Sequence, residues 1–171
     1  MKEKVINFFK ENLIFIIVII AIILIRLFIV TPVRVSGTSM YPTLKNGDIM
    51  LLNKTAKKKI KRYDVVVISK KFKGSELIKR VIGIPGDTVE SKDGKIYVND
   101  KAIDDKFAYG ITNNFDKISL SKEKNEYFVL GDNREVSLDS RILGKVDGKY
   151  IKGTSNLRLL PFSKIGNTLK K

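Results

Sequence analysis

The sequence predicts a mainly β protein, with a β-rich domain over residues 31–162 preceded by a single N-terminal transmembrane helix over residues 13–30. Two observations support this fold class. Residues 13–30 read LIFIIVIIAIILIRLFIV, the only apolar stretch long enough to span a bilayer. After residue 31, short apolar runs alternate with turn residues, and no segment keeps a 3.6-residue apolar period over a dozen positions.

The apolar stretch matches the thickness of a membrane. At about 1.5 Å per residue it covers roughly 27 Å, against about 30 Å for the hydrocarbon core. Its one charged residue, Arg26, lies near the C-terminal end, where a long side chain can reach the interface. We therefore predict a cytoplasmic tail over residues 1–12 and an uncleaved anchor over residues 13–30.

A cleavable signal peptide is the alternative interpretation of this region. Lys2, Lys4 and Lys10 would form its basic start, but the exit at residues 29–34 reads IVTPVR and contains no pair of small residues suited to cleavage. The sequence therefore favours the anchor. The excess of basic residues before the span is small, so charge alone leaves the orientation open.

The β-rich domain is predicted from runs of β-branched and apolar residues separated by turns. The candidate strands are residues 48–52, 64–69, 76–83, 95–99 and 127–131. Asp93-Gly94 is a hairpin turn signal, and Asn46-Gly47 and Pro85-Gly86 mark further turns. Residues 100–126 are polar and weakly patterned, so we expect a surface excursion. We expect residues 163–171 to form a basic C-terminal tail.

The composition excludes several kinds of chemistry. The chain has no histidine and no cysteine, which rules out a Ser-His-Asp triad, a Cys-His dyad and disulfide bonds. It also removes the usual zinc ligands, and we expect neither a metal nor a cofactor. The net charge of +15 suits nucleic acid or anionic lipid head groups. The basic cluster at residues 54–62 has no interleaved aromatic residues and matches no helix-turn-helix pattern, so we predict lipid contact and no nucleic acid.

Three segments carry candidate chemistry: residues 37–44 (GTSMYPTL), 79–87 (KRVIGIPGD) and 131–141 (GDNREVSLDSR). Taken singly, they could be a turn serine, a solvated lysine and a loop with surface ion pairs. A serine hydroxyl, however, needs an adjacent proton acceptor to attack an amide. Lysine can accept a proton only when neutral, which requires burial to lower its ordinary pKa of about 10.4. Lys79 has Leu77-Ile78 and Val81-Ile82 as apolar neighbours.

In this order, and directly after an anchor, the three segments closely resemble the type I signal peptidase family, the membrane proteases that remove signal peptides from exported proteins. The resemblance extends from the anchor to Arg141. The short middle region and single anchor are similar to the compact Gram-positive branch. The resemblance implies a signal-peptidase-like β-sheet catalytic domain on the extracytoplasmic face of the plasma membrane, with the N-terminus in the cytoplasm.

The resemblance also implies roles for individual residues. Ser39 would be the nucleophile and Lys79 the general base. Ser137 would orient the lysine amine, and the pair of Asp139 and Arg141 would brace the loop that carries Ser137.

Stabilisation of the developing oxyanion is assigned only in part. The backbone N–H of Ser39 matches one donor of the family. At the position of Gly37, Gram-negative members carry a serine whose hydroxyl is the second donor, whereas many Gram-positive members carry glycine, as this chain does. The second donor is therefore unassigned.

The resemblance implies preproteins with signal peptides as substrates, cleaved after small residues in an Ala-X-Ala-like pattern, and a secretion translocon nearby. The matching substrate-pocket positions are Val33, Val35, Met50 and Ile78, with Ser36 and Leu77 at the rim and Met40 and Leu44 in the floor of the cleft.

Other interpretations are separable from this one. A self-cleaving Ser–Lys repressor shares the dyad, but it carries a DNA-binding head where this chain has an anchor. A Ser–His signal peptidase of the endoplasmic-reticulum type is excluded because histidine is absent. A non-enzymatic, membrane-anchored basic binding protein remains as an alternative of another class. Cleavage of a preprotein after a small residue would distinguish the protease from it.

Overall fold

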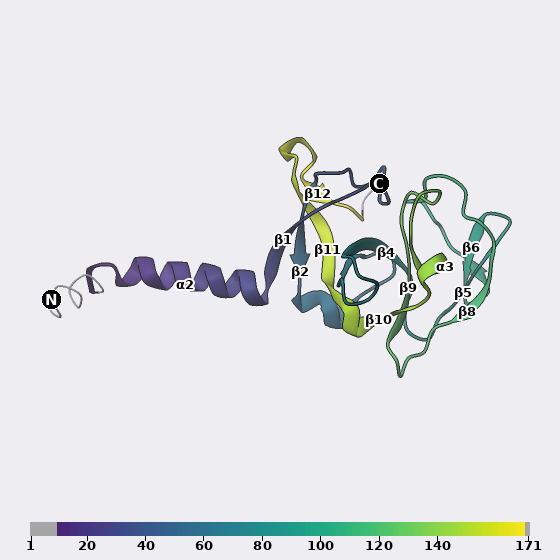
Figure 1. The fold of residues 1–171 in the computed structure, drawn as a ribbon, viewed down its shortest axis with the longest axis horizontal. Coiled ribbons are helices and arrows are strands. Elements are labelled where there is room, and N and C mark those ends of the chain that lie inside the picture. Colours follow the sequence, from purple (N-terminus) through teal and green to yellow (C-terminus); the bar gives the residue numbers. More distant parts are fainter. Residues whose placement is uncertain (1–9, 170–171) are drawn as a thin grey trace.

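The computed structural model describes residues 10–169, in which one long helix projects from a body of two β-sheets (Figure 1). The helices are α2 (Leu13–Phe28), α3 (Ser140–Leu143) and the short 3-10 helices η1 (Thr55–Lys59), η2 (Gly148–Tyr150) and η3 (Phe162–Lys164). The strands are β1 (Val30–Arg34), β2 (Ile49–Asn53), β3 (Val65–Ile68), β4 (Leu77–Gly83), β5 (Thr88–Lys92), β6 (Lys95–Val98), β7 (Lys101–Ala102), β8 (Phe115–Ser119), β9 (Glu126–Leu130), β10 (Val146–Asp147), β11 (Ile151–Leu160) and β12 (Gly166–Asn167). Most of the predicted N-terminal tail and the last two residues of the predicted C-terminal tail lie outside the described residues.

Helix α2 buries none of its side chains against the body. It ends at Phe28 and not at Val30, because Val30 already pairs with Asn53 in the antiparallel β1–β2 ladder. The helix therefore ends before residue 30, and the anchor over residues 13–30 stays a prediction. Within residues 10–169, no helix has both the length and the apolar character needed to cross a membrane.

The larger sheet has the strand order β1-β2-β11-β3-β4-β9-β10, and β12 pairs with β11 beside this path. Strand β11 lies between β2 and β3 and pairs antiparallel with both, so it joins the N-terminal hairpin to the rest of the sheet. The smaller sheet has the order β7-β6-β5-β8. Figure 1 shows the smaller sheet at the end of the body farthest from α2.

Two hydrophobic cores meet at β4 and β9. Val81 of β4 and Val129 of β9 belong to one core, which also contains Val66 of β3. Their neighbours Ile82 and Phe128 point to the other face and pack against the smaller sheet. These strands are therefore apolar on both faces, which explains their continuous apolar runs in the sequence.

The predicted mainly β architecture is confirmed, and the five candidate strands correspond to β2, β3, β4, β6 and β9. The predicted surface excursion at residues 100–126 was wrong in part, because it contains β7 and β8, and Phe107 and Thr112 are buried. Residues 166–167 of the predicted basic tail pair with β11, and Thr168 is buried, so the folded part continues beyond residue 162.

Candidate active site

The loop that carries Ser39 is the connection between β1 and β2. Its two ends are closed by hydrogen bonds from Val35 N to Asp48 O at 2.8 Å and from Gly47 N to Val35 O at 2.9 Å. A turn inside the loop is fixed by Leu44 N donating to Met40 O at 2.8 Å. The side chains of Met40 and Leu44 are buried, which ties the loop to the sheet below it.

Lys79 reaches Ser39 from another strand of the same sheet. Lys79 is on β4, forty positions further along the chain, and its Nζ donates to Ser39 Oγ at 2.7 Å. The same ammonium nitrogen donates to Ile78 O at 3.1 Å. Lys79 is only 3% exposed, whereas Ser39 is partly exposed. The hydroxyl is thus open to a substrate on one side and held by a buried amine on the other.

Burial increases the fraction of Lys79 side chains that are neutral. Burial lowers the pKa of Lys79 from 10.5 to about 8, while the carboxylates of Asp139 and Asp132 act in the opposite direction by favouring the ammonium. At pH 7 a pKa of about 8 leaves roughly a tenth of the amines neutral, whereas an ordinary lysine would leave fewer than about one in a thousand.

Asp139 and Arg141 form the pair that the sequence predicted. Asp139 is fully buried and accepts from Arg141 Nε at 2.9 Å and from Arg141 Nη2 at 2.9 Å. Its carboxylate also accepts from Gly131 N at 3.0 Å, at the end of β9. Arg141 Nη2 in turn donates to Arg134 O at 2.7 Å. The pair therefore connects both ends of the loop between β9 and α3.

A second buried ion pair lies behind the site, and sequence reasoning missed it. Arg80 Nε and Nη2 donate to the two oxygens of Asp132 at 2.8 and 2.7 Å, and both side chains are fully buried. The Arg80 guanidinium lies over the ring of Phe107, 3.7 Å from its centroid. The segment KRVIGIPGD contained Arg80, but only the strand pairing shows that it points away from Lys79 toward Asp132.

The loop after β9 also holds the backbone of the nucleophile. Asn133 N donates to Ser39 O at 3.0 Å, and the Asn133 side chain donates to Thr38 O at 3.4 Å. Two of the three segments that the sequence singled out, residues 37–44 and 131–141, are therefore in direct contact through their main chains.

Ser137 lies next to this contact but does not hydrogen-bond to Lys79. A Cβ placed on Gly131 would lie 2.1 Å from Ser137 Oγ and 2.5 Å from Ser39 O, so Ser137 and Ser39 pack against the same glycine. Ser137 is buried, and its hydroxyl has no partner among the described residues. The contact implied by the resemblance is absent from this structure.

Gly37 is exposed and has φ of 89°, a conformation that favours glycine. Its N–H donates to Asn46 Oδ1 at 3.0 Å, across the loop. The main-chain N–H of Gly37 is therefore already used in a hydrogen bond within the loop.

The predicted pocket residues divide into two groups. Val35, Met40, Leu44 and Met50 belong to a buried cluster with Val65 under the nucleophile loop, and Ile78 packs against it. The side chains of Val35 and Met50 are therefore covered in this structure, and their place in a shallow substrate pocket stays a prediction. Leu77 and Val33 are half-buried, and Ser36 is exposed.

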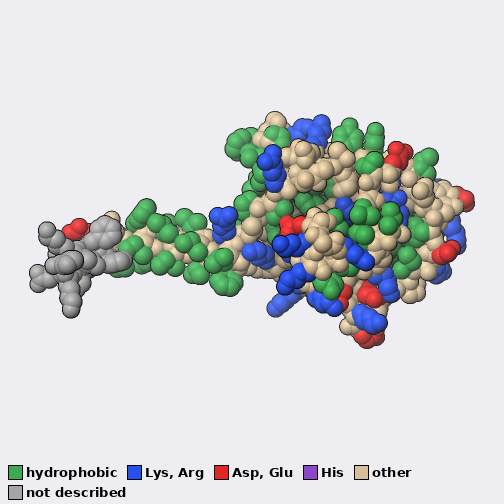
Figure 2. Space-filling model, in the orientation of Figure 1, with side chains coloured by type: hydrophobic (Ala, Val, Ile, Leu, Met, Phe, Trp, Pro, Cys, Tyr) green, Lys and Arg blue, Asp and Glu red, His purple; other side chains and the backbone are tan. Residues whose placement is uncertain are grey.

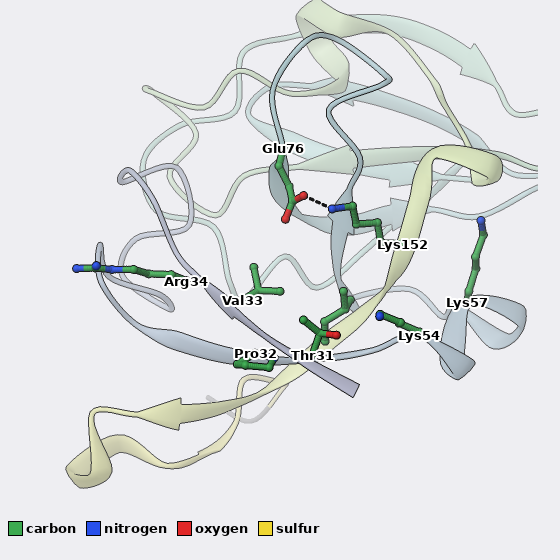
Figure 3. Close-up of a pocket in the computed structure, with 9 residues that line it drawn as sticks. Thr31, Pro32, Val33, Arg34, Lys54, Lys57, Glu76 and Lys152 are labelled. Atoms are coloured by element: carbon green, nitrogen blue, oxygen red, sulfur yellow. Dashed lines mark hydrogen bonds and ion pairs between the residues drawn. The ribbon is translucent and has the colours of Figure 1, made fainter. Parts of the chain in front are cut away.

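A cavity of about 740 Å³ lies beside Val33 (Figure 3). It is lined by Thr31, Pro32, Val33, Arg34, Leu52, Lys54, Lys57, Glu76 and Lys152. It contains neither Ser39 nor Lys79. No cluster of three or more side chains able to hold a metal ion is found in residues 10–169.

Comparisons with known proteins identify the family of this chain. The family model described as "Signal peptidase, peptidase S26" matches residues 6–160. Signal peptidase I of Bacillus licheniformis is 38% identical, with 98% of each chain covered. Signal peptidase I T of Bacillus subtilis (strain 168) is 35% identical, with 98% of this chain and 93% of the relative covered.

A solved structure supports the same relationship. The crystal structure of a signal peptidase I from Enterococcus faecalis V583 matches with a TM-score of 0.50 and 29% identity, over 56% of this chain and 96% of that one. Together with the family match, this leads to one conclusion: the chain belongs to the peptidase S26 family of signal peptidases and is a serine peptidase of the signal peptidase I type.

Proposed function

We propose that this chain is a membrane-anchored serine endopeptidase that removes signal peptides from exported preproteins, with Ser39 as nucleophile and neutral Lys79 as general base. The observation that carries the proposal is the 2.7 Å contact between the buried Lys79 amine and the partly exposed Ser39 hydroxyl. The relatives named signal peptidase I support the substrate class.

The first chemical step follows from this contact. The neutral amine takes the Ser39 proton as Oγ attacks the scissile carbonyl carbon, which gives a tetrahedral oxyanion. The Ser39 N–H is the proposed donor to that oxyanion. When the peptide C–N bond breaks, the Lys79 ammonium returns the proton to the leaving amine, and an acyl-enzyme on Ser39 remains. Water then attacks the ester with Lys79 again as the base, which regenerates the free hydroxyl and releases the new carboxylate.

Cleavage after small residues is part of the proposal. Met40, Leu44 and Met50 are packed tightly beneath the nucleophile loop, so little room is left below Ser39 for a large side chain. Val33, Leu77 and Ile78 would contact the residues upstream of the cut. A bulky scissile residue would have to displace this packing, at a cost of about 1–3 kcal/mol.

Membrane anchoring through the apolar stretch at residues 13–30 is the second part of the proposal. No side chain of α2 is buried against the body, and an apolar surface of this kind is favoured in a nonpolar environment. Figure 2 shows mostly hydrophobic side chains along this helix. We place the N-terminus in the cytoplasm and the β-domain on the extracytoplasmic side of the plasma membrane, near the secretion translocon.

The test is cleavage of a preprotein by the purified full chain in detergent. We expect a single cut after a small residue, identified by N-terminal sequencing of the released mature product. Ser39→Ala should reduce the rate to background while the circular dichroism spectrum is unchanged. A non-enzymatic basic binding protein would bind the preprotein without cutting it. Turnover by Ser39→Ala equal to that of the wild type would rule out Ser39 as the nucleophile.

A further inference from the structure

The cavity beside Val33, which we call the β1 cavity, adjoins the proposed substrate cleft. Its lining includes residues 31–34 of β1 and Glu76, which directly precedes Leu77 of β4. Val33 and Leu77 are two of the side chains that we place against the substrate upstream of the cut. The β1 cavity is therefore in a position to receive substrate residues that lie still further upstream.

The position of β1 in the sheet indicates which substrate residues these are. Among residues 10–169, β1 pairs only with β2 and is an edge strand, so its outer edge is free to run beside an extended peptide. In the Ala-X-Ala-like pattern, the third residue before the cut is small and would meet Val33. Extended chains advance by about 3.3 Å per residue. The fourth to sixth residues before the cut would then lie beside Pro32 and Thr31, inside the β1 cavity.

The β1 cavity carries an excess of positive charge. Four of its nine lining side chains are cationic and one is anionic. Glu76, the anionic one, forms an ion pair with Lys152, as Figure 3 shows. The remaining cations of the lining are Arg34, Lys54 and Lys57. The carboxylate of the lining therefore offsets only one of its four positive charges.

Main-chain oxygens hold two of the remaining cations. Lys54 Nζ donates to Leu27 O at 2.8 Å, and Lys57 Nζ donates to Lys149 O at 3.2 Å. A carbonyl oxygen accepts a hydrogen bond but carries no full negative charge, so the charge of each ammonium group persists. By Coulomb's law, these cations attract a carboxylate that enters the β1 cavity and repel a lysine or arginine side chain.

We propose that the β1 cavity selects substrates by charge at the fourth to sixth residues before the cut, so that acidic side chains are favoured and basic ones disfavoured. Arg34, Lys54 and Lys57 give the preference its sign, and the pair of Glu76 and Lys152 sets its size. This inference rests on the proposed peptidase function. It adds a preference that is separate from the requirement for small residues at the cut.

The test is cleavage of soluble peptides by the full chain in an uncharged detergent. Three peptides share one sequence except at the fifth residue before the cut, which is Asp, Asn or Lys. A second set of peptides carries the same three residues at the fifth position after the cut. The second set measures the general attraction between an acidic peptide and a protein of net charge +15, without placing the charge in the β1 cavity.

We expect the wild type to cleave the Asp peptide of the first set with a kcat/KM about tenfold higher than that of the Lys peptide. The difference should lie in KM, because the β1 cavity contains neither Ser39 nor Lys79. It should shrink in about 1 M salt, which screens exposed charges. Equal kcat/KM for the Asp and Lys peptides, or an equally large preference in the second set, would overturn the proposal.

Glu76→Gln and Lys152→Gln form a matched pair of variants. Both break the same ion pair, so a purely structural effect would be common to them. Their charge effects are opposite. Each partly exposed charge changes binding about threefold, in opposite directions for the Asp and Lys peptides. Glu76→Gln should therefore raise the Asp-to-Lys ratio of kcat/KM about tenfold, and Lys152→Gln should lower it by a similar factor.

The Asn peptide serves as the reference for each protein, which removes any common loss of activity from the comparison. Lys95→Gln, which removes an exposed lysine from the smaller sheet, should leave the Asp-to-Lys ratio unchanged. A shift of the ratio in the same direction in Glu76→Gln and Lys152→Gln would overturn the proposal, because charge selection requires opposite shifts.

The same measurements separate this inference from the proposed function. Cleavage of all three peptides without a charge preference would leave the peptidase proposal intact and remove the charge selection. Failure of the wild type to cleave any peptide or preprotein would contradict the peptidase function itself, and the charge selection with it.

Discussion

At the scale of single residues, the resemblance to the family singled out Ser39, Lys79, Asp139 and Arg141, and the structure brings Ser39 beside Lys79 and Asp139 beside Arg141. The contacts that these residues make could not be predicted from the sequence. The Asn133 N–H that holds Ser39 O is a main-chain donor, which leaves no trace in residue identity. Ser137 was assigned a hydrogen bond to the lysine, yet its hydroxyl has no partner among the described residues. Only the three-dimensional arrangement distinguishes an adjacent residue from a bonded one.

Ser137→Ala should therefore change stability by less than about 1 kcal/mol, because no hydrogen bond is lost. If Ser137 orients the amine during catalysis, the variant should lose activity, but less than Lys79→Ala loses. The matched control is Ser140→Ala, since the buried Ser140 Oγ accepts from Val129 N at 3.0 Å. That variant should lose about 1–3 kcal/mol. Thermal unfolding and kcat measure both effects, and equal loss of stability in the two variants would contradict the assignment of an unpartnered hydroxyl.

At the scale of elements, the strands with continuous β-branched runs could be predicted from the sequence. Strand β11, the longest strand among the described residues, could not. Strand β11 reads IKGTSNLRLL, in which polar residues interrupt the apolar ones. Its pairing with β2 and β3 includes register shifts, and these break the two-residue alternation on which strand prediction depends. Because β11 is held by neighbours on both sides, tertiary pairing and not local preference determines its structure.

The close approach of β9 to the nucleophile loop gives a prediction at this scale. Gly131→Ala should reduce kcat strongly, because its Cβ would collide with Ser137 Oγ and with the main-chain oxygen of Ser39. The control is Gly148→Ala, whose Cβ would lie 2.1 Å from the end of the Asn125 side chain. We expect the control to lose stability without losing kcat per folded molecule. Wild-type kcat in Gly131→Ala would contradict the proposed coupling of the two elements.

The buried ion pair of Arg80 and Asp132, which joins β4 to the loop after β9, gives a second prediction at the scale of elements. Asp132→Asn should destabilise the fold by about 3–5 kcal/mol, because the Arg80 charge would stay buried without its counterion. Replacing both partners, as in Arg80→Met with Asp132→Leu, should recover part of this loss. Chemical denaturation of the three proteins measures the free energies of unfolding. If the double variant were less stable than Asp132→Asn, the pair would contribute more to the free energy of unfolding than the neutralisation of one buried charge by the other.

At the scale of the whole molecule, the sequence predicted a β-rich domain after an apolar helix, and the mainly β fold is confirmed. The division into two sheets was not predicted, because residues 100–126 are too polar to reveal β7 and β8. The same arrangement positions the chemistry: the β1–β2 hairpin supplies Ser39, β4 supplies Lys79, and the loop after β9 supports both. The central claim is that this assembly makes Lys79 a neutral base.

The most direct test is the pH dependence of kcat/KM for cleavage of a preprotein, measured for the wild type and for Lys79→Arg. Because the neutral amine is the active form, the rate should be low at acidic pH and rise to a plateau with an apparent pKa of about 8, the value to which burial lowers the pKa of Lys79. Lys79→Arg keeps the positive charge but cannot give up its proton, so it should be inactive across the range. Substantial activity of Lys79→Arg, or a wild-type rate that rises only near the ordinary lysine pKa of about 10.4, would contradict the claim.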